Sequence, residues 1–374
     1  MKKIYFGFLF ITTVASAQPN MSPRNPGDTL QSVRILNGND VVLSIYAPKA
    51  SEVSVMGDFL KEYKPLSLTK ADNGVWSVML NGVRPDLYTY DFSVDGVRTF
   101  DQRNPVYKES ENGMSNLFEV PGAEDDYCAK KDVPHGKVEI VWLHSSVLNN
   151  DVRMHVYTPP GFEKMKGKLP VLYLQHGGGD NDASWTTAGR ANFILDNLLA
   201  AGKIKPFVVV MAMGHPVQGF HMEAGIENDP YYKILFNDIM PYAEKHYNVS
   251  DKRDDRAFSG LSMGGLQALN IAIFAPEKFG YMLPLSTGYF PAQLKDIEEH
   301  HADALKNPEI NKFKLFWIAM GGEKDIAYEN GNKVMAMFDK YGIKYQKAPT
   351  FPAGHTFLTW RHNLYDFAPL LFKK

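Results

Sequence analysis

The sequence predicts two folded domains, an all-β sandwich followed by a larger α/β domain with a doubly wound sheet. Residues 31–120 contain short alternating strands broken by turn residues, as in a small β-sandwich. From residue 138 onward, apolar strand-like runs alternate with helical patterns. The segment 121–137, which is charged and carries Pro and Gly, separates the two patterns. We therefore assign the sandwich to residues 18–125 and the α/β domain to residues 126–374.

Residues 1–17 have the pattern of a signal peptide. Lys2 and Lys3 precede an apolar stretch that ends at Ala15-Ser16-Ala17, the small-residue pattern at which signal peptidase cuts. A membrane anchor would need about 20 apolar residues, and this stretch is shorter because Thr12 and Thr13 interrupt it. We expect export, to the periplasm or out of the cell, and no membrane span.

The composition excludes two other classes of protein. A hydrophobic content of 44% rules out a disordered chain, and a formal charge of -2 with interspersed signs provides no basic face for nucleic acid. Cys128 is the only cysteine, so an internal disulfide is impossible and the fold depends on its core.

The N-terminal half carries hairpin signals between its predicted strands. Asn73-Gly74, Asn81-Gly82 and Asp95-Gly96 are the dipeptides that tight turns prefer. Trp76 alternates with apolar neighbours, so packing in the core is at least as plausible for it as stacking on a glycan.

The C-terminal half has the pattern of a parallel sheet with crossover helices. Continuous runs such as "VLYL" and "FVVV" suit strands that are buried on both faces. Helical patterns follow them in "ANFILDNLLAAG", "LFNDIMPYAEKHY" and "GGLQALNIAIFA".

The segment "RAFSGLSMGGLQALNIAIF" combines a strand, a turn and a helix around Ser262. Gly260-Leu261-Ser262-Met263-Gly264 fits the Gly-x-Ser-x-Gly nucleophile elbow, whose glycines are needed because a Cβ two residues to either side of the serine would clash. A serine in an ordinary tight turn is the alternative. The strand before and the helix after favour a nucleophile.

A serine hydroxyl needs a base to remove its proton, and His355 is the candidate. It lies in the Pro- and Gly-rich stretch "APTFPAGHTFL", downstream of Ser262, as the order serine, acid, histidine requires. We interpret His300, His301 and His362 as structural or solvated residues.

The acid should follow the predicted strand "KLFWIAMGG". Glu323 and Asp325 both occupy the loop after that strand, and the sequence pattern alone does not choose between them.

An oxyanion requires backbone donors fixed in advance. Residues 176–179, "HGGG", follow the first long parallel strand and resemble the loop that supplies such donors. We expect the Gly178 and Met263 N–H groups to form the oxyanion hole. A flexible glycine turn would be plausible for this loop alone, but not for the loop together with the elbow at Ser262. Together these features predict a serine hydrolase.

The stretches "HGGGDNDASW", "FSGLSMGGLQALNIA", "FWIAMGGEKD" and "GHTFLTWR" resemble carbohydrate esterase family one, which includes feruloyl and acetyl xylan esterases. The likeness covers about residues 138 to 372. It implies an α/β-hydrolase fold and a triad of Ser262, Asp325 and His355. The N-terminal stretch, with "GVWSVMLNGVRPDLYTYDFSVDGVRTFD", resembles the immunoglobulin-like domain related to carbohydrate-binding module family 48.

This resemblance implies an esterase that releases ferulate or a related hydroxycinnamate from feruloylated xylan or arabinoxylan oligosaccharides. The mechanism needs no metal or organic cofactor. We expect residues 214–233 to form a loop that shapes the substrate site. Trp185, Tyr289 and Phe290 are candidate aromatic residues at the pocket rim, although each could instead be packing.

Three alternatives stay open. Acetyl xylan esterase is the closest one, and a siderophore trilactone esterase is more distant. A binding module on an inactive hydrolase scaffold belongs to a different class. The oligomeric state is not predicted.

Overall fold

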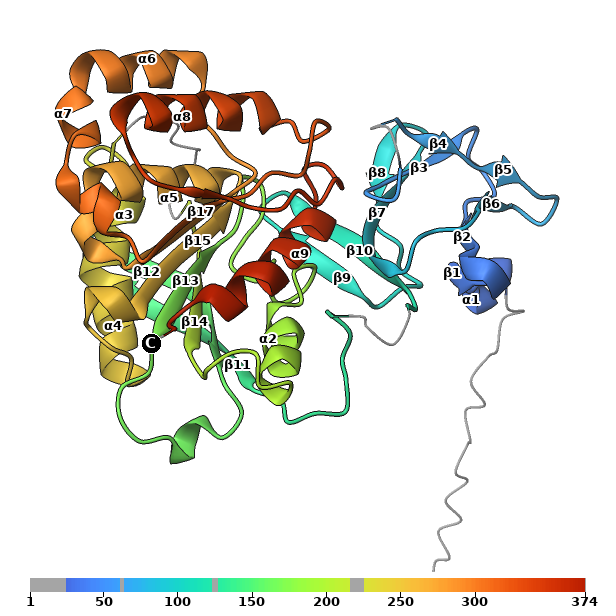
Figure 1. Cartoon of the computed structure of the whole chain (residues 1–374). Coiled ribbons are helices and arrows are strands. Elements are labelled where there is room, and N and C mark those ends of the chain that lie inside the picture. Colours follow the sequence, from blue (N-terminus) through green and yellow to red (C-terminus); the bar gives the residue numbers. More distant parts are fainter. Residues whose placement is uncertain (1–24, 61–63, 123–126, 216–224, 374) are drawn as a thin grey trace, which may run out of the picture.

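A computed structural model describes residues 25–60, 64–122, 127–215 and 225–373. Its architecture confirms the predicted fold class: an antiparallel β-sandwich is followed by a mostly parallel sheet with helices on both faces (Figure 1). The predicted signal peptide lies outside the described residues. None of the described helices is long and apolar enough to cross a lipid bilayer.

The sandwich consists of two antiparallel sheets. Their strand orders are β1-β2-β6-β5 and β4-β3-β7-β10-β9, with β8 paired to β7. The strands are β1 (Val33–Ile35), β2 (Val41–Tyr46), β3 (Val53–Gly57), β4 (Leu66–Ser67), β5 (Thr69–Lys70), β6 (Val75–Leu80), β7 (Asp86–Val94), β8 (Val97–Thr99), β9 (Tyr107–Ser110) and β10 (Gly113–Val120).

Two of the three predicted turns are hairpins. Asp95-Gly96 joins the paired strands β7 and β8 with φ of 48° and 82°, as a tight turn with two left-handed residues requires. Asn73-Gly74 lies between the paired strands β5 and β6. The prediction of a hairpin at Asn81-Gly82 is wrong, because β6 and β7 belong to different sheets and this turn carries the chain across the sandwich.

The sandwich core is closed partly by the other domain. Trp76 is 7% exposed and its Nε1 donates to Ala47 O over 2.9 Å, so it packs in the core. Leu358, from the α/β domain, is buried in the same cluster of apolar side chains, and Phe351 and Ala353 pack against it. The two domains therefore share one apolar core at their junction.

The second domain is built on a sheet of order β11-β12-β14-β13-β15-β16-β17-β18. β11 and β12 are antiparallel to their neighbours, and the pairs from β14 to β18 are parallel. Its strands are β11 (Lys137–Ser145), β12 (Asn150–Thr158), β13 (Val171–Gln175), β14 (Val208–Ala212), β15 (Arg256–Leu261), β16 (Tyr281–Leu285), β17 (Leu315–Ile318) and β18 (Gln346–Lys347).

Helices cover both faces of this sheet (Figure 1). They are α2 (Ala191–Ala200), α3 (Pro230–Ile234), α4 (Met240–His246), α5 (Met263–Phe274), α6 (Pro291–His300), α7 (Ala302–Leu305), α8 (Tyr328–Tyr341) and α9 (Phe357–Phe367), while α1 (Pro26–Thr29) precedes the sandwich. Short 3-10 turns occur at η1 (Asn37–Asn39), η2 (Phe162–Lys164), η4 (Arg253–Asp255), η5 (Pro276–Lys278), η6 (Pro308–Lys312) and η7 (Ala368–Leu370), and a π-turn η3 (Leu235–Ile239) joins α3 to α4.

The continuous apolar runs are explained by burial on both faces. Along β13, Val171 and Tyr173 point into one core, shared with α5 and α8. Leu172 and Leu174 point into the other core, shared with α2 and α9. Because successive side chains of a strand face opposite sides, a strand between two helical layers must be apolar at every position.

Candidate active site

The strand β15, Ser262 and the helix α5 form a sharp turn. Ser262 has φ 52° and ψ -111°, a conformation that is strained for a residue with a side chain. A Cβ on Gly260 would lie 2.4 Å from the Gly264 carbonyl carbon, and one on Gly264 would lie 2.6 Å from His176 O. Both glycines are therefore required by the close approach of backbone, as the elbow motif predicts.

A histidine and an aspartate come together beside this turn. His355 Nδ1 and Asp325 Oδ1 are 2.7 Å apart, and the side chains are 14% and 0% exposed. An ionised carboxylate only accepts hydrogen bonds, so Nδ1 carries the proton and Nε2 is left to exchange one. Ser262 and His355 line the same cavity.

Several donors hold Asp325 in the ionised form. Gly321 N donates to its Oδ2 over 2.8 Å and Ala327 N donates to its Oδ1 over 3.0 Å. Burial by itself raises the pKa of Asp325, but the hydrogen bonds from His355 and the Ser286 hydroxyl outweigh it, and the pKa is lowered below its ordinary value.

The geometry separates the two candidate acids. Asp325 is 3% exposed and is hydrogen-bonded to His355, whereas Glu323 is exposed to solvent. Two residues apart in a loop, the carboxylates point in different directions. Asp325 is thus the carboxylate that meets the histidine.

The predicted oxyanion residues lie next to each other. Met263 is the first residue of α5, so its N–H has no acceptor within the helix. A Cβ on Gly178 would be 3.9 Å from Met263 Cβ, which places the glycine loop alongside the helix start. Gly264 N donates to His176 O over 3.1 Å and ties the loop to the helix.

Sequence reasoning missed the part that His176 plays in holding this loop. Gly214 N donates to His176 Nε2 over 2.9 Å, so the proton is on Nδ1, which lies 2.8 Å from Gly177 O. Burial lowers the pKa of His176 to about 4 and keeps the ring neutral. His176 is the first residue of the "HGGG" run, and this position is the sequence signal that could have identified its role.

A second missed group lies in the same loop. The Asp182 carboxylate accepts from Arg153 Nε over 2.9 Å and lies 2.7 Å from His155 Nδ1. Burial raises the pKa of Asp182, but these two partners more than offset it, so its net pKa is lowered. No sequence motif marks this cluster, because its partners come from β12 and are far away along the chain.

Ser286 was also missed, and it links the acid to α9. Trp360 Nε1 donates to Ser286 Oγ over 2.9 Å, while the Ser286 hydroxyl donates to Asp325. The His355 and Trp360 rings meet edge to face, with centroids 5.1 Å apart. The hydrogen bonds that run from Trp360 through Ser286 to Asp325 fix the orientation of the Trp360 ring and of the His355 ring.

The cavity above Ser262 has a volume of about 300 Å³. Its walls are mainly apolar, and its lining includes Met263, Leu266, Thr287, Phe290, Ile326 and Asn330. Phe290 is 45% exposed and Ile326 is 74% exposed. Phe290 is thus at the rim, as predicted from the sequence.

The prediction that Trp185 and Tyr289 also lie at the rim is wrong. Trp185 is 1% exposed and its Nε1 donates to Gln175 O, while Tyr289 is 0% exposed and its hydroxyl donates to Asn270 Oδ1. Each ring packs in the core, and each polar atom is satisfied there.

The three histidines that the sequence analysis interprets as structural or solvated do not line the cavity. The His362 ring stacks on Phe351, with centroids 3.6 Å apart, and His300 is exposed on α6. His301 meets Phe274 edge to face. Of the predicted loop 214–233, residues 216–224 lie outside the described residues.

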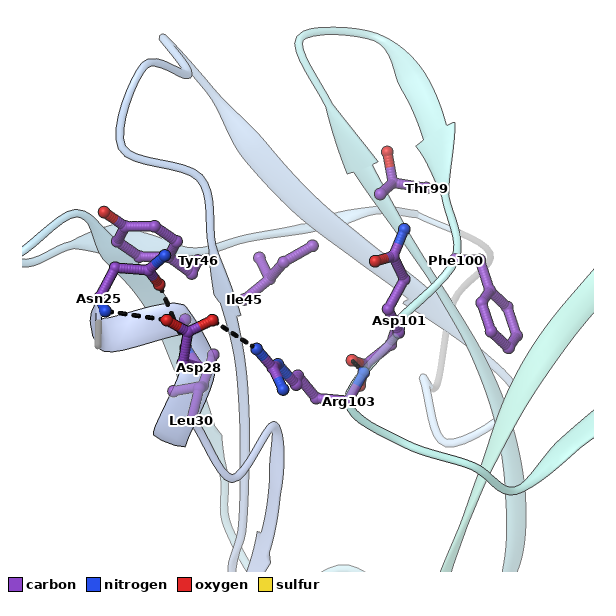
Figure 2. A pocket seen from close by; sticks show the side chains of 11 residues that line it. Asn25, Asp28, Leu30, Ile45, Tyr46, Thr99, Phe100, Asp101 and Arg103 are labelled. Atoms are coloured by element: carbon purple, nitrogen blue, oxygen red, sulfur yellow. Dashed lines mark hydrogen bonds and ion pairs between the residues drawn. The ribbon is translucent and has the colours of Figure 1, made fainter. Parts of the chain in front are cut away.

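A further cavity lies in the sandwich domain (Figure 2). It measures about 320 Å³. In its lining, the Asp28 carboxylate accepts from Asn25 N and forms an ion pair of 3.2 Å with Arg103. Within the described ranges, no group of three or more His, Cys, Asp or Glu residues could hold a metal ion.

Comparison with known families identifies both domains. A family model described as "Putative esterase" matches residues 145–370. The chain belongs to this esterase family. Carbohydrate-binding module 48, the isoamylase N-terminal domain, matches residues 29–106 of the same esterase.

The esterase is related to feruloyl esterases. It is 34% identical over 314 residues to an endo-1,4-beta-xylanase/feruloyl esterase from Xylanibacter ruminicola, a match that covers 82% of this chain and 41% of the relative. It is 27% identical to endo-1,4-beta-xylanase Y from Acetivibrio thermocellus, covering 60% of this chain and 22% of the relative. The chain thus spans less than half the length of these relatives.

Solved structures show the same fold. The feruloyl esterase module from Clostridium thermocellum complexed with sinapinate superposes with a TM-score of 0.56 at 23% identity, covering 67% of this chain and 92% of the module. The enterochelin esterase from Shigella flexneri gives a TM-score of 0.67 at 17% identity, covering 91% of this chain and 95% of that one.

Proposed function

We propose that this esterase is a serine hydrolase that releases ferulate or a related hydroxycinnamate from feruloylated xylan or arabinoxylan. The observation that carries the proposal is the hydrogen bond between His355 and Asp325 beside a serine on a strained elbow. The relationship to a xylanase/feruloyl esterase supports the choice of acyl group and polysaccharide.

The reaction proceeds through an acyl-enzyme. Ser262 attacks the ester carbonyl while His355 takes the serine proton, and Asp325 holds the imidazolium that results. The Gly178 and Met263 N–H groups stabilise the oxyanion. His355 then returns the proton to the departing sugar oxygen. Water, activated by the same histidine, releases the acid.

The cavity above Ser262 supports an aromatic acid. A volume of about 300 Å³ is far more than an acetyl group fills. Phe290 stands at the rim with 45% of its surface exposed, where an aromatic ring can stack against it. A cavity of this size disfavours an acetyl xylan esterase, for which a much smaller pocket would suffice.

The decisive experiment compares kcat/KM on methyl ferulate, an acetylated xylan and a trilactone siderophore. We expect methyl ferulate to be the best of the three. Fast acetate release with negligible ferulate release would overturn the proposal. A burst of product from an activated aryl ester would exclude an inactive hydrolase scaffold.

A siderophore trilactone esterase is the second candidate. The likeness to the enterochelin esterase extends over 91% of the chain and so includes both domains. This extent favours keeping the trilactone esterase as a candidate. At 17% identity this likeness concerns the fold alone. Preferential cleavage of the trilactone would establish it.

Export completes the proposal. The signal-peptide pattern of residues 1–17 supports a periplasmic or secreted enzyme, as a polysaccharide substrate requires. Fractionation of expressing cells, with detection of cleavage after Ala17, tests it. A full-length protein in the cytoplasm would contradict it.

A further inference from the structure

A second cavity adjoins the active site, between the two domains. It has a volume of about 280 Å³. Its lining from the sandwich includes Met56, Asp58, Thr89 and Lys108, and its lining from the α/β domain includes Asp180 and His355. Figure 1 shows α9, which follows His355, beside β9 and β10 of the sandwich. The cavity therefore needs both domains to exist.

His355 is the residue that this cavity shares with the cavity above Ser262. An ester has an acyl side and an alcohol side, and the alcohol oxygen must lie beside the group that protonates it. If the acyl group fills the apolar cavity, the alcohol extends past His355. The interdomain cavity is the space that begins there.

We propose that the interdomain cavity is the subsite for the sugar alcohol of the substrate. This rests on the proposed function, in which Ser262 is acylated. As the bond between the carbonyl carbon and the sugar oxygen breaks, the electron pair stays on that oxygen. The proton on His355 Nε2 goes to it, which leaves a free sugar hydroxyl in the interdomain cavity and neutral His355.

The two cavities differ in their charged side chains. Both have mainly apolar walls, but the lining of the first holds no Asp, Glu, Lys or Arg. The second carries the Asp58 carboxylate and an ion pair between Lys108 Nζ and Asp180, and its Lys108 also lies 5.5 Å from the centre of the Phe357 ring. Carboxylates accept from sugar hydroxyls and an ammonium group donates to them.

Asp58 is the residue best placed to accept a hydrogen bond from a sugar hydroxyl. Its Oδ1 accepts from Thr89 N over 2.8 Å, and it is partly exposed to the cavity. Burial raises the pKa of Asp58 to about 6, against the lowering effect of the nearby Arg361. A carboxyl group withdrawn from water in this way gains from each hydroxyl donor that a ligand brings.

The test uses one substrate with the sugar and one without it, a feruloylated arabinose-containing oligosaccharide and methyl ferulate. Asp58→Asn removes the charge, and Met56→Trp fills the cavity. We expect each variant to lower the ratio of kcat/KM for the oligosaccharide to kcat/KM for methyl ferulate by about tenfold or more. The control is Asp72→Asn, an exposed residue of the same domain, which should keep the parental ratio.

Parental ratios in both variants would overturn the subsite. If the parent cleaved neither feruloyl ester, the proposed function would fail, and binding would decide on the subsite separately. Calorimetry then measures an unacylated arabinoxylo-oligosaccharide with the parent and with Met56→Trp. Binding that Met56→Trp abolishes supports the subsite. No binding by the parent, or equal binding by both, overturns it.

Discussion

The Arg361 guanidinium donates to Asp86 Oδ1 over 2.7 Å, and the two side chains are 1% and 3% exposed. Asp86 begins β7 in the sandwich, whereas Arg361 lies on α9, six residues after His355. The same guanidinium donates to Leu87 O over 2.7 Å. A buried ion pair thus ties the helix next to His355 to the other domain.

Removing one partner of this pair should be costly. Breaking a buried ion pair leaves an uncompensated charge and costs about 3–5 kcal/mol. We expect Asp86→Asn to lower the free energy of unfolding by about 3 kcal/mol, measured by urea denaturation. The control is Glu119→Gln, which breaks the more exposed pair with Arg190 and should cost less than about 1 kcal/mol. Equal losses in the two variants would contradict the argument.

Deleting residues 18–125 should reduce stability and solubility more severely than it affects chemistry on a small ester. The deletion leaves Arg361 without its carboxylate and exposes Leu358 to water. The measurements are soluble yield, thermal unfolding, and hydrolysis of methyl ferulate by whatever fraction folds. A truncated chain with parental thermal stability would show that the interface contributes little.

Ser262→Ala should abolish turnover and keep the fold. The hydroxyl is needed for attack, and the backbone bond from Ser262 N to Leu285 O remains in the variant. Loss of the nucleophile costs about a factor of a million in kcat in subtilisin, a different serine hydrolase. Single-turnover kinetics on an aryl ester measure the loss, with circular dichroism to check folding. An active variant would end the assignment.

Asp325→Asn should lower kcat by about three to four orders of magnitude, since an amide favours the wrong tautomer of His355. Glu323→Gln is its matched control. Because Glu323 is exposed, that change should stay within about tenfold of the parent. Both variants are assayed on one aryl ester at neutral pH. The reverse order of effects would make Glu323 the acid.

Protonation of His362 should lower the free energy of unfolding in mild acid. Burial lowers its pKa from 6.5 to about 4. Below pH 6.5 the unfolded chain binds a proton at His362 that the folded chain refuses until about pH 4, so stability is lost as the pH falls through this window. Urea denaturation from pH 7 to pH 4 should show that the free energy of unfolding declines less in His362→Phe than in the parent. The difference should be at most about 3 kcal/mol.

His176 shares the same lowered pKa, so the decline should be reduced in His362→Phe and not removed. Identical pH profiles for the parent and His362→Phe would mean that His362 titrates alike in the folded and unfolded chain.

Local sequence patterns predicted the elements whose structure depends on neighbouring residues. The elbow at Ser262 follows from two glycines and a strand-helix change within a few residues, and the buried strands follow from their apolar runs. Asn81-Gly82 shows the limit. The dipeptide determines a tight turn, but the partner of each flanking strand is chosen by packing across the whole sandwich.

Burial of large aromatic residues could not be predicted from their position in a loop. Trp185 lies in the loop after β13 and Phe290 in the loop after β16, yet one is 1% exposed and the other 45%. What separates them is a distant neighbour: Trp185 meets Phe357 edge to face, 5.7 Å between centroids, and Phe357 comes from the far end of the chain. The choice between Glu323 and Asp325 likewise depended on where the loop of His355 lies.

The contribution of Phe351, Ala353 and Leu358 to the sandwich core has a consequence for synthesis. A ribosome releases the sandwich residues first, and N-terminal domains usually fold as they emerge. Here the apolar side chains that complete the core are made long after the sandwich strands, because Leu358 lies more than 200 residues beyond Val120, the last residue of β10. The apolar opening of the first domain therefore stays uncovered until these later residues have been synthesised.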